Sequence, residues 1–186
     1  MAHTLDLIRH LSLFAVLVVA LYTDLAQGRV ENACAYGGIA LGLILHTLAA
    51  GWGSGGIADC LRDPDAAGLA NALLGGGAAF ALFFPFFWAG GFGGGDLKLM
   101  TAVGTLSGLC VTLTALVLTA AAGAAMAVGL LILKGRLAEG LKGSWGILRR
   151  LGRPAPAAGG AERLTLRYVP AIAIGTTWAW YLQHAR

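Results

Sequence analysis

Long apolar segments follow one another along nearly the whole chain, and they constrain its fold more than any other feature. A segment of about 20 apolar residues can cross the roughly 30 Å hydrocarbon core of a membrane as a helix. The chain is 58% hydrophobic and 12% charged, which is about half the charge of an ordinary soluble domain. We therefore predict an all-α integral membrane protein, a bundle of about six transmembrane helices that forms a single domain over residues 1–186, with approximate spans 5–23, 33–50, 66–92, 97–112, 114–133 and 168–184.

The positive charges are unevenly distributed between these spans. The only long polar segment, residues 134–167, holds eight Lys and Arg residues, and alternation places Arg29 and Lys98 on the same side. Ten of the thirteen Lys and Arg residues then share one side, which the positive-inside rule identifies as cytoplasmic. This orientation places both termini outside. Because the N-terminus lacks the basic region and cleavage site of a removed signal peptide, we expect the first helix to be retained.

Residues 134–153 combine positive charge with apolar residues at helical spacing, namely Leu137, Leu141, Trp145 and Leu148. This pattern predicts a basic amphipathic helix on anionic lipid headgroups. The lipid bilayer is therefore an expected partner, and no nucleic-acid partner is expected.

A glycine-rich stretch precedes a lone carboxylate at the start of the fourth predicted span. Five of the seven positions from 90 to 96 are glycine, and Asp96 follows them. A carboxylate at the membrane boundary costs several kcal/mol, so its presence there indicates a function. Asp24 follows the first span, and alternation places it on the same membrane face as Asp96. The sequence therefore predicts a polar pocket that contains both aspartates.

Two carboxylates at one depth are the minimum apparatus for activating water against a peptide bond. Mutual repulsion makes a close pair share one proton. One aspartate can then act as general base on the water, while the other polarises the carbonyl and protonates the leaving amine. This chemistry requires no metal and no cofactor.

The three cysteines, Cys34, Cys60 and Cys110, are isolated in the sequence and have no ligand-like spacing to a histidine. We therefore predict neither a disulfide framework nor a zinc site. His46 lies near the outer end of the second span, away from the aspartates, and no role is assigned to it.

Three motifs resemble the type IV prepilin peptidase family, whose members are G-x-G-D intramembrane aspartyl proteases. They are Gly93-x-Gly95-Asp96 with Lys98 two residues later, Asp24 followed by Arg29 and Asn32, and the segment 168–175 at the start of the last span. The resemblance covers nearly the whole chain. Val30-Glu31 stands where the family usually has Ile-Pro before the asparagine.

The resemblance implies an aspartic endopeptidase of the bacterial inner membrane, with Asp24 and Asp96 as catalytic residues and its active site toward the cytoplasm. The substrate would be a prepilin with a basic leader, cut just ahead of its apolar helix. The chain is similar to short, peptidase-only members that serve Flp (tight-adherence) pili, so N-methyltransferase activity is not expected. Gly93, Gly95, Lys98, Arg29 and Asn32 are candidate substrate or site-supporting residues.

Several alternatives stay open at this point. Lys98 can hold a carboxylate or extend to lipid headgroups, Arg29 can serve only to set topology, and Asn32 can lie in a solvated loop. A preflagellin peptidase or another G-x-G-D protease would share the chemistry but differ in substrate. A small proton- or ion-coupled transporter would use the two carboxylates differently, and a non-enzymatic assembly subunit is a third class. No oligomeric state is assigned.

Overall fold

The computed structural model describes residues 2–50, 68–135, 143, 145, 146, 149 and 167–185. Within this part of the chain all regular structure is helical, which confirms the all-α prediction. The helices are α1 (Ala2–Gln27), α2 (Asn32–Ala50), α4 (Leu69–Trp88), α5 (Gly94–Leu133) and α7 (Val169–His184). Residues 51–67 and most of the basic segment predicted as an amphipathic helix at 134–153 lie outside the described residues.

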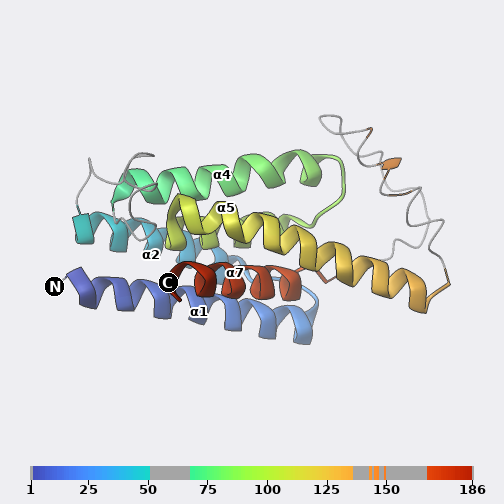
Figure 1. The fold of residues 1–186 in the computed structure, drawn as a ribbon, viewed down its shortest axis with the longest axis horizontal. Helices are drawn as coiled ribbons and strands as arrows, with labels where there is room; N and C mark the ends of the chain where they lie inside the picture. The colour runs from blue at the N-terminus through green and yellow to red at the C-terminus, as the bar shows by residue number, and fades with distance from the viewer. Residues whose placement is uncertain are drawn as a thin grey trace.

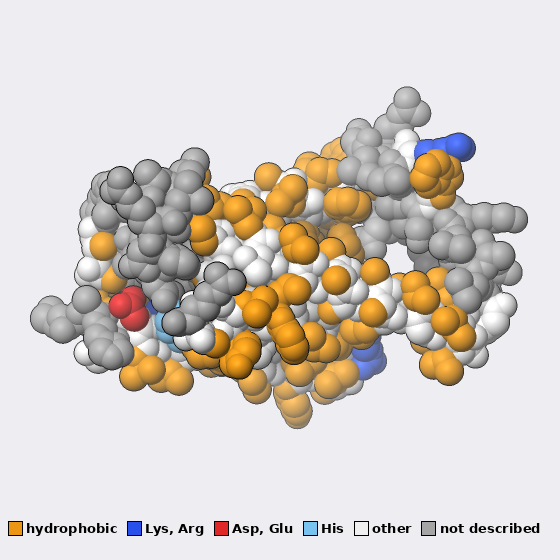
Figure 2. Space-filling model, in the orientation of Figure 1, with side chains coloured by type: hydrophobic (Ala, Val, Ile, Leu, Met, Phe, Trp, Pro, Cys, Tyr) orange, Lys and Arg blue, Asp and Glu red, His pale blue; other side chains and the backbone are white. Residues whose placement is uncertain are grey.

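Four of these helices are long and apolar enough to cross a membrane: α1 from Thr4, α2, α4 and α5. Helices suit such a setting because each satisfies its own backbone hydrogen bonds. In the space-filling view, hydrophobic side chains are spread over most of the described part of the visible face, and few charged side chains are seen there (Figure 2). The surface thus agrees with a protein surrounded by lipid.

Helix α5 occupies the centre of the bundle and contacts every other described helix (Figure 1). Its later part extends past the ends of the other helices (Figure 1). Its first half is almost completely buried; Leu99, Met100 and Val103 are all fully inaccessible to solvent. The core therefore forms around the segment that directly follows Asp96.

Helix α5 is interrupted at Gly108, whose φ of 77° and ψ of 176° are not helical. Before this residue α5 runs antiparallel to α4, because Gly104 lies against Gly75 near the start of α4 and Gly94 lies against Phe87 near its end. After it, α5 runs antiparallel to α7, since Gln183 bonds to Cys110 and Tyr168 bonds to Thr119.

The start of α7 lies at the end of α4, where the Tyr168 and Phe83 rings are 6.2 Å apart. Together with the antiparallel pairings, this means that the chain reverses direction at Gly108. The two apolar segments after Asp96 require a turn between residues 107 and 114, and the reversal at Gly108 falls in that range. Residues 94–107 are roughly 21 Å long at 1.5 Å per residue, which is shorter than a full membrane crossing.

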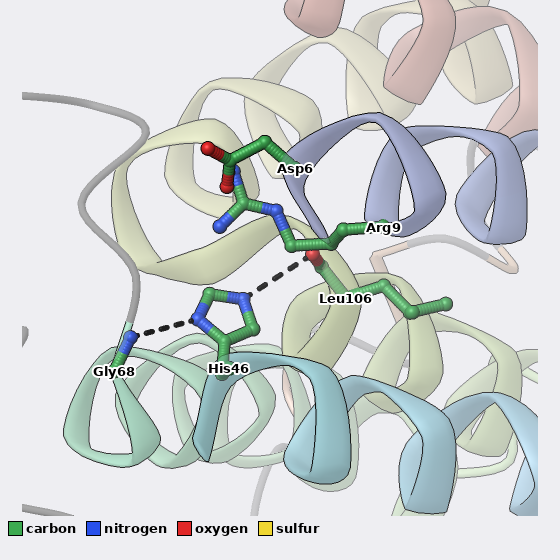
Figure 3. Close-up of polar contacts among 5 residues, drawn as sticks. All are labelled: Asp6, Arg9, His46, Gly68 and Leu106. Atoms are coloured by element: carbon green, nitrogen blue, oxygen red, sulfur yellow. Dashed lines mark hydrogen bonds and ion pairs between the residues drawn. The ribbon is translucent and has the colours of Figure 1, made fainter. Parts of the chain in front are cut away.

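Polar side chains surround this reversal, because a broken helix leaves backbone groups without partners. The Nε2 of His46 lies 3.4 Å from the carbonyl oxygen of Leu106, and the backbone N–H of Gly68 donates to its Nδ1 at 3.3 Å (Figure 3). The N–H of Leu109 donates to Oδ1 of Asn71 at 2.7 Å. His46, to which the sequence assigns no role, is buried and stabilises the turn through these hydrogen bonds.

Two further observations concern this end of the bundle. Arg9 and Asp6, one turn apart on α1, form an ion pair of 3.6 Å beside His46 (Figure 3). Cys110 is disulfide-bonded, while Cys34 is free. The prediction of no disulfide is therefore wrong for Cys110: a disulfide depends on which residues meet in space, and isolated cysteines in the sequence do not show this.

Candidate active site

Asp24 lies in the last turn of α1, at the end of the bundle opposite His46. The helix ends because Gly28, with a φ of 70°, adopts the left-handed conformation that glycine tolerates best, and its N–H donates to the carbonyl oxygen of Asp24 at 2.9 Å. The predicted first span ended at residue 23, so the helix continues farther than expected and includes Asp24. Only 6% of Asp24 is exposed.

The carboxylate of Asp24 is not fully satisfied. Its Oδ2 atom is buried and accepts no hydrogen bond from the residues that the structure describes. A buried polar atom without a partner costs free energy, so native proteins keep few of them and often use them in function. The unpartnered oxygen therefore marks Asp24 as a candidate functional group.

Asp96 lies in the first turn of α5 and is partly buried. Its Oδ2 accepts a hydrogen bond from the backbone N–H of Gly93 at 3.2 Å, which caps the helix and fixes the carboxylate. The helix begins at Gly94, three residues before the start predicted at 97, so Asp96 lies inside it. Gly95, which precedes Asp96, lies against Val30 in the loop that follows Asp24, so the two carboxylates are at the same end of the bundle.

The predicted glycines let the two aspartate-bearing segments approach. A Cβ atom on Gly95 would lie 3.3 Å from Cβ of Val30, which belongs to the loop after α1. A Cβ atom on Gly93 would lie 3.3 Å from Oδ2 of Asp96. Both distances are tighter than ordinary contact, so larger residues would push the loop or the carboxylate aside.

Lys98 and Asn32, two other predicted site residues, contact each other. Nζ of Lys98 donates to Oδ1 of Asn32 at 2.9 Å and lies 4.9 Å from the ring centroid of Tyr36. Lys98 thus joins α5 to the start of α2, and no hydrogen bond to Asp96 is found for it among the described residues. Arg29 is exposed in the loop between α1 and α2.

Two residues that were not predicted as site residues also lie at this end of the bundle. Nη1 of Arg167 donates to the carbonyl oxygen of Leu25 at 2.8 Å, and its guanidinium interacts electrostatically with Asp24. Tyr168 interacts electrostatically with Asp96, and its ring centroid lies 4.5 Å from that of Phe92. Arg167 had been counted only as a charge that sets topology.

This arrangement suits general acid–base catalysis, in which no side chain forms a covalent bond with the substrate. One carboxylate is buried and has an oxygen that accepts no hydrogen bond from the described residues, the other is oriented by a backbone N–H, and a cation lies beside the first. Two carboxylates within a few Å of each other can share one proton and activate a water molecule. Among the described residues, no group of three His, Cys, Asp or Glu side chains is arranged to hold a metal ion.

Comparison with known proteins gives one match. The model of the type IV leader peptidase family matches residues 11–128, which is more than half of the chain. The matched region includes both Asp24 and Asp96 and ends before α7. Neither a curated protein nor a solved structure matches the chain.

Proposed function

Because the chain belongs to the type IV leader peptidase family, we propose that this peptidase is a prepilin peptidase, an intramembrane aspartic endopeptidase that removes the leader from pilin-like precursors. The observation that carries the proposal is that Asp24 and Asp96 lie at one end of the bundle, where Oδ2 of Asp24 is buried and accepts no hydrogen bond from the described residues. Gly93, Gly95, Asn32 and Lys98 support this site by packing and by joining the helices around it.

In the proposed mechanism the ionised aspartate takes a proton from a water molecule held between the two carboxylates. The water oxygen attacks the carbonyl carbon of the scissile peptide bond, while the protonated aspartate donates a hydrogen bond to the carbonyl oxygen. Collapse of the tetrahedral intermediate then transfers a proton to the leaving amine. The Gly93 N–H keeps the Asp96 carboxylate in place throughout.

We further propose six membrane segments, with the two parts of α5 on either side of Gly108 counted separately. Cys110 is disulfide-bonded at the end of the bundle opposite the aspartates. Since disulfides persist in the oxidising periplasm and not in the cytosol, that end faces the periplasm of a bacterial inner membrane. This orientation agrees with the positive-inside prediction and places Asp24 and Asp96 toward the cytoplasm.

The orientation has a direct test in a Cys34→Ser background. Spheroplasts are treated with a membrane-impermeant maleimide, which reacts only with thiols on the outer face. We expect Ala185→Cys to be labelled and Lys134→Cys to stay unlabelled until the membrane is permeabilised. The reverse pattern would contradict the proposed topology.

The activity is tested with purified protein in detergent micelles and a panel of precursors, analysed by mass spectrometry. The panel contains pilin precursors of the tight-adherence type, other type IV pilin precursors and an archaeal preflagellin precursor. We expect cleavage at the boundary between the basic leader and the apolar helix of the pilin precursors. Cleavage of the preflagellin alone would show that the substrate is a preflagellin and not a pilin precursor. If no precursor in the panel is cleaved, the proposal is refuted.

Replacing Arg167 is expected to slow turnover. Arg167→Gln removes a charge-assisted hydrogen bond to Leu25 and the cation beside Asp24, which together correspond to about a tenfold loss in kcat. Arg167→Lys should recover part of that loss. The matched control is Arg29→Gln, which removes an exposed guanidinium from the same end; equal losses in both variants would show that only net charge matters.

Replacing Lys98 is expected to affect stability more than turnover. Lys98→Met should change kcat by less than about threefold and lower the free energy of unfolding by about 1 kcal/mol. A double-mutant cycle with Asn32→Ala tests the cause, because the second substitution should add little once the hydrogen bond is lost. A large loss of kcat with unchanged stability would instead assign Lys98 to the reacting groups.

A further inference from the structure

A shallow apolar groove runs along the outside of the bundle between α1 and α2. Its volume is about 560 Å³, and its walls include Ala15 and Val19 of α1 and Gly37, Leu41 and Ile44 of α2. Sγ of Cys34 lies 3.6 Å from the carbonyl oxygen of Val16 and joins the two helices at the groove. Small side chains on its walls leave room for another helix to approach closely.

The glycines of α2 differ in whether packing against the described helices explains them. A Cβ atom on Gly42 would lie 2.7 Å from the backbone of Thr105, and one on Gly38 would lie 3.1 Å from Cβ of Ala102, so both glycines allow α5 to approach. A Cβ atom on Gly37 would have nothing within 4 Å. Glycine disfavours a helix relative to alanine by about 1 kcal/mol, and no contact within the described structure compensates for it at Gly37.

One end of the groove carries a negative charge and lies beside the candidate active site. Glu31 lines the groove and is exposed. It directly follows Val30, which covers Gly95 next to Asp96. A helix lying in the groove would therefore bring the residues that precede it to Glu31 and to the aspartates. The negative charge of Glu31 is complementary to basic residues that directly precede a helix bound in the groove.

From these observations we infer that the groove binds the apolar helix of the precursor, with the basic end of the leader beside Glu31. The inference rests on the proposed function and adds to it a docking surface and the direction in which the substrate lies. From Glu31 to Ile44 the groove is roughly 20 Å long at 1.5 Å per residue, which corresponds to most of one membrane-spanning helix. The peptide bond just ahead of that helix then lies at the level of Asp24 and Asp96.

Photocrosslinking tests the binding without requiring cleavage. The photoreactive residue p-benzoylphenylalanine replaces Leu41 in the groove or Leu73 on α4, which is also exposed. Both are made in an Asp24→Asn/Asp96→Asn background, in micelles with a pilin precursor whose leader is rich in lysine. We expect the precursor to be captured from position 41 and not from position 73. Capture of only lipid, only detergent or a second copy of this chain would overturn the inference, as would equal capture from both positions.

Two substitutions sharpen the test. Gly37→Leu fills the groove and should reduce capture by about tenfold, whereas Gly77→Leu should not, although Gly77 is also a helical glycine with nothing within 4 Å. Glu31→Lys should weaken capture of the lysine-rich leader, and a precursor with a glutamate-rich leader should restore it. Unchanged capture in Gly37→Leu would overturn the inference. Crosslinking is measured in a protein that cannot cleave, so it tests the groove alone. The proposed function is tested by a different experiment, and it is refuted if the unaltered protein cleaves no precursor.

Discussion

The Asp24→Asn and Asp96→Asn variants are each expected to lose at least about a thousandfold in kcat on a pilin precursor, while the protein stays folded. Asparagine has nearly the same size as aspartate but cannot take up or release the proton. Each substitution therefore removes one half of the acid–base pair and leaves the shape of the site unchanged.

The surroundings of the two aspartates explain why these variants should fold. The N–H of Gly93 can still donate to the amide oxygen of an asparagine at position 96, so the start of α5 keeps its cap. Oδ2 of Asp24 has no hydrogen bond to lose within the described residues. Asp96→Ala, in contrast, should also cost about 1 kcal/mol of stability because the cap disappears.

The measurement is cleavage of the precursor by mass spectrometry, with thermal unfolding followed in parallel. The Arg29→Gln variant serves as the control, since it changes the charge at the same end of the bundle without touching either carboxylate. Retained cleavage in either asparagine variant would rule out a mechanism that needs both aspartates. Loss of cleavage together with a large drop in melting temperature would point to a folding defect instead.

The helices of this protein are largely predictable from its apolar segments, whereas their ends depend on single glycines. The predicted span 33–50 nearly coincides with α2 (Asn32–Ala50). Helix α1 continues four residues beyond the predicted 23, until Gly28 ends it, and α5 starts at Gly94 because glycines do not prevent a first helical turn once the Gly93 N–H is bonded. These shifts matter for function, since they place both aspartates inside helical turns.

The contacts around the site are harder to predict because they join distant parts of the chain. Arg167 and Leu25 are 142 residues apart, and Lys98 and Asn32 are 66 apart. Hydropathy shows which residues cross the membrane, but it does not show which helices become neighbours. For the same reason the bond between His46 and Leu106 and the disulfide at Cys110 could not be predicted from local patterns.

Three consecutive glycines in α4 have different surroundings, and this difference leads to the second large prediction. A Cβ atom on Gly75 would collide with the carbonyl oxygen of Gly104 and lie 2.7 Å from the carbonyl carbon of Gly108. A Cβ atom on Gly77 would have nothing within 4 Å. The backbones of α4 and α5 therefore touch at Gly75, where α5 is buried, and the atoms in the way are backbone atoms that cannot turn aside like a side chain.

Gly75→Ala is accordingly expected to lower the free energy of unfolding by about 3 kcal/mol, because the two backbones must separate to admit one methyl group. The substitution should also reduce proteolytic activity, since the displaced half of α5 carries Asp96. Gly77→Ala, two residues away in the same helix, should leave stability unchanged or raise it by up to about 1 kcal/mol through helix propensity. Thermal unfolding of both variants in the same detergent decides the matter. Equal melting temperatures would mean that α4 and α5 do not pack backbone to backbone at Gly75, and the position of Asp96 in the bundle would then have to be revised.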